Sequence, residues 1–480
     1  MAGVLVESRR PRAIREHPRA GWFAVATVCF GAFIGQLDAS IVTLTFPALQ
    51  REFHAPMAAV QWVSLAYLLV LVGLLAVAGR FADALGRKLV YLQGFAVFGI
   101  GSLLCGLAGS LEWLILFRVV QAIGAAMLQA NSVALVVTSV SRDRMRSALG
   151  VQAAAQALGL ALGPVLGGVL VQSAGWRWVF WIAVPVTCLA LVAGRYLLPR
   201  TRERTPVNRF DMLGFLALVV TSTAMLLALS GVSGLPMPGW VALALAIGTV
   251  LAAMMFVARE RRTTCPLIDL TVLTPAAVSY LGVALCGYLV LFGPLALLPQ
   301  VFAGRGLGEL TSGLVISALP AGFAATALTV DRLAPAHWGP RTRSLLGALT
   351  CALASGAAAV VAGSVTVDAV ALFVLGLGLG VLIPANNTAI MRTIPARMSG
   401  VGGGLVNMSR GLGTAIGVAL VTLCLHLVAG AAGPRIAMTA LALVALLAGV
   451  LSLALHDHRY GVGHSSTSAG DDHAQPSHPA

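Results

Sequence analysis

Residues 150–168 read GVQAAAQALGLALGPVLGG, an apolar stretch in which glycines and a proline interrupt a helical pattern. In water each interior glycine would cost about 0.5–1 kcal/mol relative to alanine, and the proline about 3 kcal/mol. In a membrane, small residues let helices approach closely, and neighbouring helices satisfy the backbone groups that a proline frees. The stretch therefore predicts a membrane-spanning helix in close contact with others.

The composition of the whole chain supports a membrane protein. Hydrophobic residues make up 58% of the 480 residues and charged residues only 10%, whereas a soluble domain carries about 25% charged residues. The net charge of +14 would suggest a nucleic-acid partner in a soluble protein. Here the positions of the charges matter more than their sum, so we expect membrane lipid and no nucleic acid as the surroundings of the chain.

Apolar runs of about 20 residues, the length that crosses a bilayer core, occur fourteen times. They lie at 22–48, 58–79, 89–109, 113–138, 148–172, 177–198, 211–232, 239–258, 275–302, 310–330, 344–363, 367–391, 399–429 and 435–455. Most of the 31 basic residues fall in alternate loops, whereas only Arg51, Arg177, Arg305 and Arg435 fall in the others. By the positive-inside rule both termini are cytoplasmic, and the chain is expected in the plasma (inner) membrane as a multi-pass protein.

A weak internal repeat divides the chain. The segment GRFADALGRK at 79–88 has a degraded counterpart, DRLAPAHWGPR, at 331–341, each in a predicted cytoplasmic loop between the second and third helices of a six-helix unit. Repeated halves around a central cavity are common in transporters. We therefore expect a basic N-tail at 1–21, one bundle at 22–198, a linker at 199–274 with two inserted helices (211–232 and 239–258), a second bundle at 275–455 and a disordered cytoplasmic tail at 456–480.

Four motifs resemble those of one transporter family. They are LDASIVTLTFP at 37–47, with Thr43 where members usually have asparagine, GRFADALGRK at 79–88, LFRVVQAIG at 116–124 and the stretch at 150–168. Together they make the chain similar, over nearly its whole length, to the fourteen-helix drug:proton antiporters of the major facilitator superfamily. The resemblance implies an all-α integral membrane fold of two six-helix bundles plus two inserted helices. It also implies multidrug efflux and antibiotic resistance, driven by the proton motive force without any cofactor.

The resemblance assigns roles to two of these motifs. A conformational latch at the cytoplasmic mouth is expected at Gly79, Asp83, Gly86, Arg87 and Lys88, although a charged loop obeying membrane topology is the alternative. An antiporter motif that bends a helix beside the cavity and limits proton leak is expected at Gly150, Gly159, Gly163, Pro164, Gly167 and Gly168. Ordinary small-residue packing would use the same residues.

One carboxylate, Asp38, lies well inside a predicted hydrocarbon span. An ionised group there costs about 2.5–3.5 kcal/mol, so it needs a partner or a protonation role. Asp38 lies roughly 24 Å above the inner end of its helix, and Arg118 roughly 8 Å below the outer end of the fourth helix. These levels nearly coincide in a core about 30 Å thick. Opposing effects of burial and of Arg118 on proton affinity favour a proton-coupling pair, and a static ion pair remains the alternative.

Polar residues inside the helices mark a candidate substrate cavity. They are Gln36, Gln121, Gln129, Asn131, Gln152, Gln156, Asn386, Asn387, Asn407 and Arg410. Each is also explained as a hydrogen bond between helices. His426 is interpreted as a packed histidine, with a second proton site as the alternative. The lack of a second deep acid disfavours divalent cations as substrates and favours monovalent lipophilic cations, zwitterions or neutral amphiphiles, while the two arginines permit anions.

Other functional classes are less well supported. HExxH, GxSxG and P-loop motifs are absent from the sequence, which disfavours an enzyme, and the seven cysteines form no CxxC pair that would suggest a metal site. A dedicated exporter of a single metabolite or self-made antibiotic would share the same motifs. A symporter and a non-transporting membrane sensor are further alternatives. A monomer is compatible with the sequence, and an accessory export protein stays open.

Overall fold

The computed structural model describes residues 7, 10–141, 144–201, 211–232, 235, 237–263, 273–333, 335, 338–361, 364–394, 399–428, 430 and 432–453. All regular secondary structure in these ranges is helical. The predicted tail at 456–480 lies outside them. Within them, thirteen helical spans are long and apolar enough to cross a membrane. The shorter apolar stretch Met212–Ala228 stands where the sequence predicts the seventh of fourteen helices. Because the described elements are all helical and most are long enough to span a membrane, the all-α membrane fold is confirmed.

The N-terminal part of the chain forms six spans after the short helix α1 (Arg12–Arg15). The first is α2 (Ala20–Ile41), which continues through η2 (Val42–Thr45) into α3 (Phe46–Phe53). The others are α4 (Met57–Val60) with α5 (Trp62–Leu85), α6 (Arg87–Leu107), α7 (Leu111–Ser139), α8 (Met145–Ala174), and α9 (Arg177–Trp181) with α10 (Ala183–Leu197). In this half α2 packs on α8, and α7 packs on both α5 and α6.

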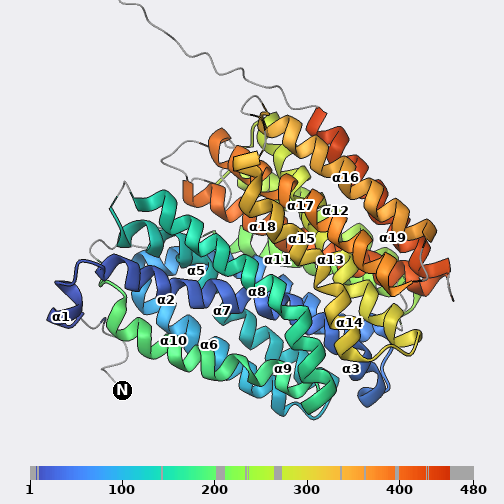
Figure 1. The fold of residues 1–480 in the computed structure, drawn as a ribbon, viewed down its shortest axis with the longest axis horizontal. Helices are drawn as coiled ribbons and strands as arrows, with labels where there is room; N and C mark the ends of the chain where they lie inside the picture. Colours follow the sequence, from blue (N-terminus) through green and yellow to red (C-terminus); the bar gives the residue numbers. More distant parts are fainter. Residues whose placement is uncertain are drawn as a thin grey trace, which may run out of the picture.

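The C-terminal part forms a second bundle beside the first (Figure 1). It consists of α13 (Pro275–Gly304), α14 (Glu309–Ile316) with α15 (Ala318–Leu333), α16 (Pro340–Val361), α17 (Val365–Thr393), α18 (Ser399–Leu427) and α19 (Ala432–Leu453). Here α16 packs on α17 and α19, while α13 packs on α18. Each bundle has its own apolar core, although Leu44 and Leu160 of the first pack into the core of the second.

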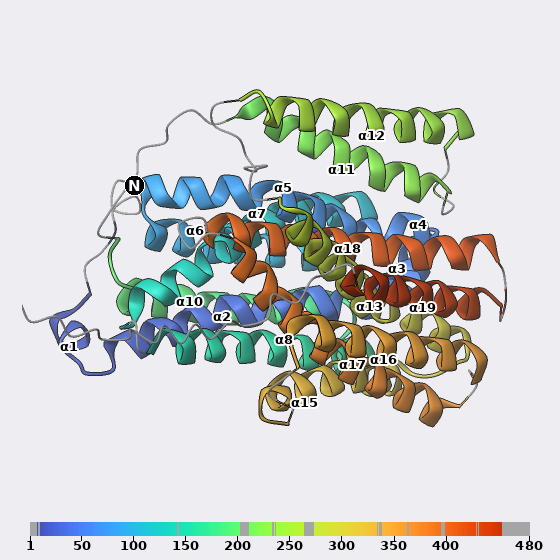
Figure 2. The same cartoon turned by 90° about the horizontal axis from the view of Figure 1, so that it is seen from above.

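Two further helices, α11 (Met212–Val232) and α12 (Gly239–Glu260), lie along one side of the molecule (Figure 2). The helix α11 contacts α5 of the first bundle and α18 of the second. At the α5 contact Gly73 faces Val219, and Gln61 Nε2 donates to Ser230 Oγ at 3.2 Å. Most of α12 is exposed, as expected for a helix that is apolar on every side and faces lipid.

The segment at 79–88, predicted as a loop, is almost entirely helical. The helix α5 continues to Leu85, and α6 begins at Arg87. Only Gly86 separates them, and its φ of +117° is a conformation that residues with a side chain rarely adopt. A Cβ at this position would lie 2.8 Å from the Cδ of Glu7. The prediction of a loop was wrong because a single glycine suffices to reverse the chain here.

The two bundles meet closely at one end, which the charge pattern assigns to the outer side. A Cβ on Gly168 of α8 would lie 2.5 Å from the backbone oxygen of Glu309 in α14, and Gly313 of α14 would meet the backbone oxygen of Pro164. Gln172 Oε1 accepts from the Leu310 backbone N–H at 3.0 Å. Arg51 forms an ion pair with Glu309 at 2.8 Å. Small residues therefore allow backbone contact between the halves at this end.

Candidate functional site

A buried ion pair joins α2 to α7. Arg118 Nη1 donates to both carboxylate oxygens of Asp38, at 2.9 and 2.8 Å. The exposed fraction is 5% for Asp38 and 1% for Arg118, so neither charge is screened by solvent. The structure thus brings together the two residues that the depth comparison placed at one level.

The pair belongs to a hydrogen-bonded network in which each charged group has further partners. Gln121 Nε2 donates to Asp38 Oδ1 at 3.0 Å and to Ser102 Oγ at 2.8 Å. Arg118 Nε donates to the Val63 carbonyl at 2.9 Å, and the guanidinium lies 4.1 Å from the ring centroid of Tyr67. Gln121, predicted as a cavity residue, instead forms part of this network and is fully buried. The network has the partners that a buried charge pair requires.

A small cavity lies between the two halves, and α2 and α7, which carry this network, form part of its lining. Its lining comes from α2 (Gly31, Ala32, Gly35, Gln36), α7 (Leu128, Gln129, Ser132), α8 (Gln156) and α18 (Arg410). Four of the predicted polar residues line it, namely Gln36, Gln129, Gln156 and Arg410. Gln152 lies behind it and donates to Ser132 Oγ at 2.7 Å.

Arg410 is the cationic group in the lining of this cavity. It donates to Gln129 Oε1 across the interface between the bundles. No ion pair joins Arg410 to a carboxylate in the part of the chain that the structure describes. Ser132 was not among the predicted site residues. Its position three residues after Gln129, on the same helix face, is the sequence pattern that could have identified it.

The other polar candidates lie apart from the cavity lining. Asn386 Nδ2 donates to the Tyr280 carbonyl at 2.8 Å, and Asn387 Nδ2 donates to the Tyr288 hydroxyl at 3.2 Å. The side-chain oxygens of both asparagines are buried and accept no hydrogen bond within the described ranges. Asn407 is half-buried on α18. His426 is exposed in the last turn of α18, so its interpretation as a packed histidine was wrong.

The glycines at 150–168 face two different neighbours. Gly159 lies against the Phe33 backbone of α2, Gly163 against Ser40 and Gly167 against Ile41 and Leu44, so this face holds α8 close to the first span. Gly168 and Pro164 instead meet α14 of the other bundle. Gly150 has open space around it. Most of this stretch therefore lies at close helix contacts, and its outer end lies at the interface between the halves.

The predicted latch lies where α5 turns into α6. Lys88 is fully buried, and its Nζ donates to the carbonyls of Arg195 and Leu198, at 2.8 and 3.0 Å, where α10 ends. The Glu7 carboxylate accepts from the Leu89 backbone N–H at 3.3 Å and from Thr201. These contacts lie within the first half of the chain. Gly79 faces Ala130 of α7. The side chain of Asp83 lies outside the described residues.

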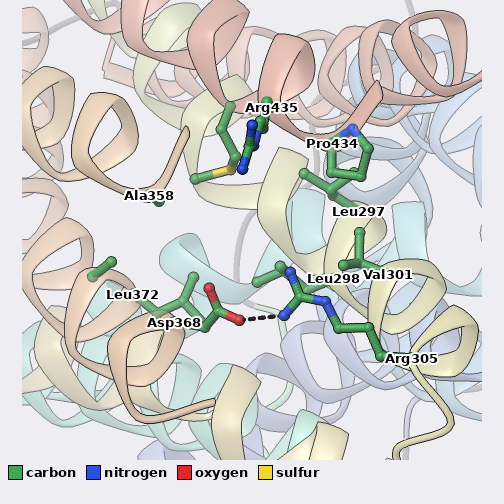
Figure 3. A pocket seen from close by; sticks show the side chains of 11 residues that line it. Leu297, Leu298, Val301, Arg305, Ala358, Asp368, Leu372, Pro434 and Arg435 are labelled. Carbon is green, nitrogen blue, oxygen red and sulfur yellow. Dashed lines mark hydrogen bonds and ion pairs between the residues drawn. The ribbon is translucent and has the colours of Figure 1, made fainter. Parts of the chain in front are cut away.

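A second small cavity lies within the outer ends of α13, α16, α17 and α19. Its walls are mainly apolar, with Leu297, Leu372 and Met438 among them. An ion pair between Arg305 and Asp368, at 2.8 Å, stands on one side, and Arg435 stands on the other (Figure 3). This outer cavity belongs to one bundle only, unlike the central one. In the described ranges no cluster of three or more potential metal ligands occurs.

Comparisons with known proteins all lead to membrane transporters and to resistance or export proteins. A family model described as Major Facilitator Superfamily matches residues 28–418. The "Tetracenomycin C resistance and export protein" of Streptomyces glaucescens is 30% identical over 422 residues, which cover 85% of this chain and 78% of that protein. The "Multidrug resistance protein Stp" of Mycobacterium tuberculosis is 31% identical, over 81% of this chain and 73% of its own length. The crystal structure of a peptide transporter, POT, superposes over 95% of this chain and 97% of its own with a TM-score of 0.68 at 16% identity, which supports the fold.

Proposed function

Because this chain belongs to the Major Facilitator Superfamily, a family of membrane transporters rather than enzymes, we propose that it exports lipophilic, antibiotic-like small molecules by exchanging them for protons. It is a multi-pass protein of the plasma membrane. The names of its relatives, which include antibiotic and multidrug resistance proteins, support export as the direction of transport.

The observation that carries the proton-coupling proposal is the buried pair of Asp38 and Arg118, which joins α2 to α7, two helices that line the central cavity. Asp38 itself lies outside the lining, on a different face of α2 from Gln36. Protonation of Asp38 would leave Arg118 as an uncompensated buried charge, which is costly. The network must then rearrange, and a rearrangement of α2 against α7 reaches the cavity directly because both helices line it. Proton binding and substrate binding are thus linked through the same two helices.

Alternating access requires the outer contact between the halves to open. In this structure that contact includes the α8 to α14 packing, the hydrogen bond from Leu310 to Gln172 and the ion pair from Arg51 to Glu309. A transport cycle separates α8 from α14 while the cavity closes on the cytoplasmic side. Rigid-body movement of one bundle against the other achieves this without unfolding either core.

The proton-coupling role is tested by comparing two buried aspartates that each pair with an arginine. Asp38→Asn removes the deep carboxylate, and Asp368→Asn removes the carboxylate of the outer pair at the same N–O distance of 2.8 Å. In everted vesicles with an imposed pH gradient, we expect Asp38→Asn to lose dye accumulation while retaining dye binding, and Asp368→Asn to keep both. Equal transport by wild type and Asp38→Asn would overturn proton coupling through this residue.

A dedicated exporter of one compound is the second candidate, because the relatives include both single-antibiotic and multidrug resistance proteins. The two functions use the same coupling network and differ in the range of substrates. A panel of structurally unrelated dyes in the same vesicles separates them. Transport of several dyes supports multidrug efflux, whereas transport of none, together with resistance to one compound in cells, supports a dedicated exporter.

A further inference from the structure

We infer that the compounds carried in the central cavity bear an anionic oxygen, a carboxylate or a phenolate, which binds to Arg410. This inference rests on the proposed transport function and adds the chemical class of the substrate. It depends on the charge balance of the cavity, which differs from that of the neighbouring network.

The two arginines near the centre have different partners. Arg118 is neutralised by Asp38 and satisfied further by Gln121 and Val63. Among the described residues, Arg410 donates to one side chain, the neutral amide of Gln129. The guanidinium has five N–H donors, so it retains donors for a second acceptor. The ion pair contributes no net charge, and the cavity therefore carries the positive charge of Arg410.

Every polar group that lines the cavity with Arg410 is neutral. These groups are Gln36 of α2, Gln129 and Ser132 of α7, and Gln156 of α8. The neighbouring carboxylate, Asp38, is already held by Arg118 and Gln121. The described lining thus offers a cation and amide donors but no carboxylate to pair with them.

A bound anion supplies the missing partner. A guanidinium presents two parallel N–H groups that match a carboxylate, and the amide N–H groups of Gln36 and Gln156 provide further donors. The remaining lining, Gly31, Ala32, Gly35 and Leu128, is small or apolar, so the apolar part of a ligand would contact these residues. An amphiphilic acid therefore satisfies both parts of the cavity, whereas a lipophilic cation meets like charge at Arg410.

The test uses two xanthene dyes of nearly the same shape and opposite charge, fluorescein (anionic) and rhodamine 123 (cationic). Fluorescence anisotropy measures their binding to the purified full-length protein in nanodiscs at neutral pH. We expect wild type to bind fluorescein at least tenfold more tightly than rhodamine 123. Arg410→Gln is expected to lose about tenfold of the fluorescein affinity with no loss for rhodamine 123, and Arg410→Lys to retain part of it, because lysine keeps the charge but not the planar pair of donors.

A matched control is Arg435→Gln, which removes an arginine from the outer cavity of the same bundle. It should leave both dye affinities unchanged, and a loss confined to this variant would overturn the assignment to Arg410. A second measurement needs no variant, since naphthalene-2-carboxylate should displace fluorescein from wild type and naphthalene-2-carboxamide should not. Equal displacement by the two compounds, or tighter wild-type binding of rhodamine 123, overturns the inference.

The outcomes also separate this inference from the proposed function. Vesicles that accumulate rhodamine 123 but not fluorescein support export and overturn the anion assignment. Protein that binds fluorescein through Arg410 but accumulates neither dye supports the anion site and contradicts export. A fall of both dye affinities in Arg410→Gln, with a lowered melting temperature, assigns Arg410 a structural role and overturns the inference.

Discussion

The two arginines at the centre of the molecule show how the same side chain serves different purposes. Arg118 lies within one bundle, 1% exposed, with a carboxylate, an amide and a backbone carbonyl around it. Arg410 is half-buried, lines the space between the bundles and donates to one amide from the opposite half. The comparison teaches that the partners of a buried charge, rather than its depth, indicate whether it acts on the protein itself or on a ligand.

The largest effect on stability is expected when Arg118 is replaced. Arg118→Gln leaves Asp38 buried without its counter-charge, so we expect a loss of about 3–5 kcal/mol in the free energy of unfolding. Thermal unfolding of the detergent-purified protein, followed by size-exclusion chromatography, measures the change. Arg410→Gln serves as the control and should lower the melting temperature little, because no carboxylate loses its partner. Equal losses in the two variants would remove the distinction between the arginines.

A double substitution in the same ion pair is expected to have an intermediate effect on stability. Asp38→Asn combined with Arg118→Gln removes both charges and leaves amides that can hydrogen-bond to each other and to Gln121. We expect the double variant to recover at least half of the stability lost in Arg118→Gln, since no buried charge is left without a partner. A double-mutant cycle on melting temperatures gives the coupling. Additive losses would show that the two side chains do not act as a pair.

The smallest effect on stability is expected at the ion pair between Arg51 and Glu309, which joins the two halves. Arg51 is 67% exposed in its side chain, and surface pairs contribute about 0–1 kcal/mol. Arg51→Gln should therefore leave the melting temperature nearly unchanged, while it weakens the contact between α3 and α14 and favours opening on that side. Labelling of a cysteine introduced at Gly308 by a membrane-impermeant maleimide would increase about two- to fivefold, with Arg177→Gln, which breaks a pair inside one half, as the control. Unchanged labelling would show that Arg51 does not hold the outer side closed.

Much of this arrangement could be predicted from the sequence because membrane constraints are strong. Runs of apolar residues and the asymmetry of arginines predict the spans, and rise per residue alone places Asp38 level with Arg118. Rotation of a helix about its own axis is harder to predict when every face is apolar. Gln121 and Gln129 of α7 were therefore both assigned to the cavity, although Gln121 faces Asp38, and Gln129, two turns further on, faces Arg410.

Contacts distant in sequence were also missed. The burial of Lys88 against the end of α10, and of Glu7 against the turn at Gly86, depends on segments more than 80 residues apart. In the sequence alone, the charged segment at 79–88 resembles a solvent-exposed loop. Only the packed structure shows that its lysine satisfies the carbonyls that every helix leaves free at its C-terminus.

The placement of α11 has a consequence for the lipid around the protein. This helix contacts α5 and α18, which belong to opposite bundles, and α12 covers it on the outside. When the bundles move relative to each other, the contact area along α11 must change on at least one side, and acyl chains must follow that change. Bilayer thickness and lateral pressure thereby enter the energetics of every turnover, through a pair of helices that contribute no residue to the central cavity.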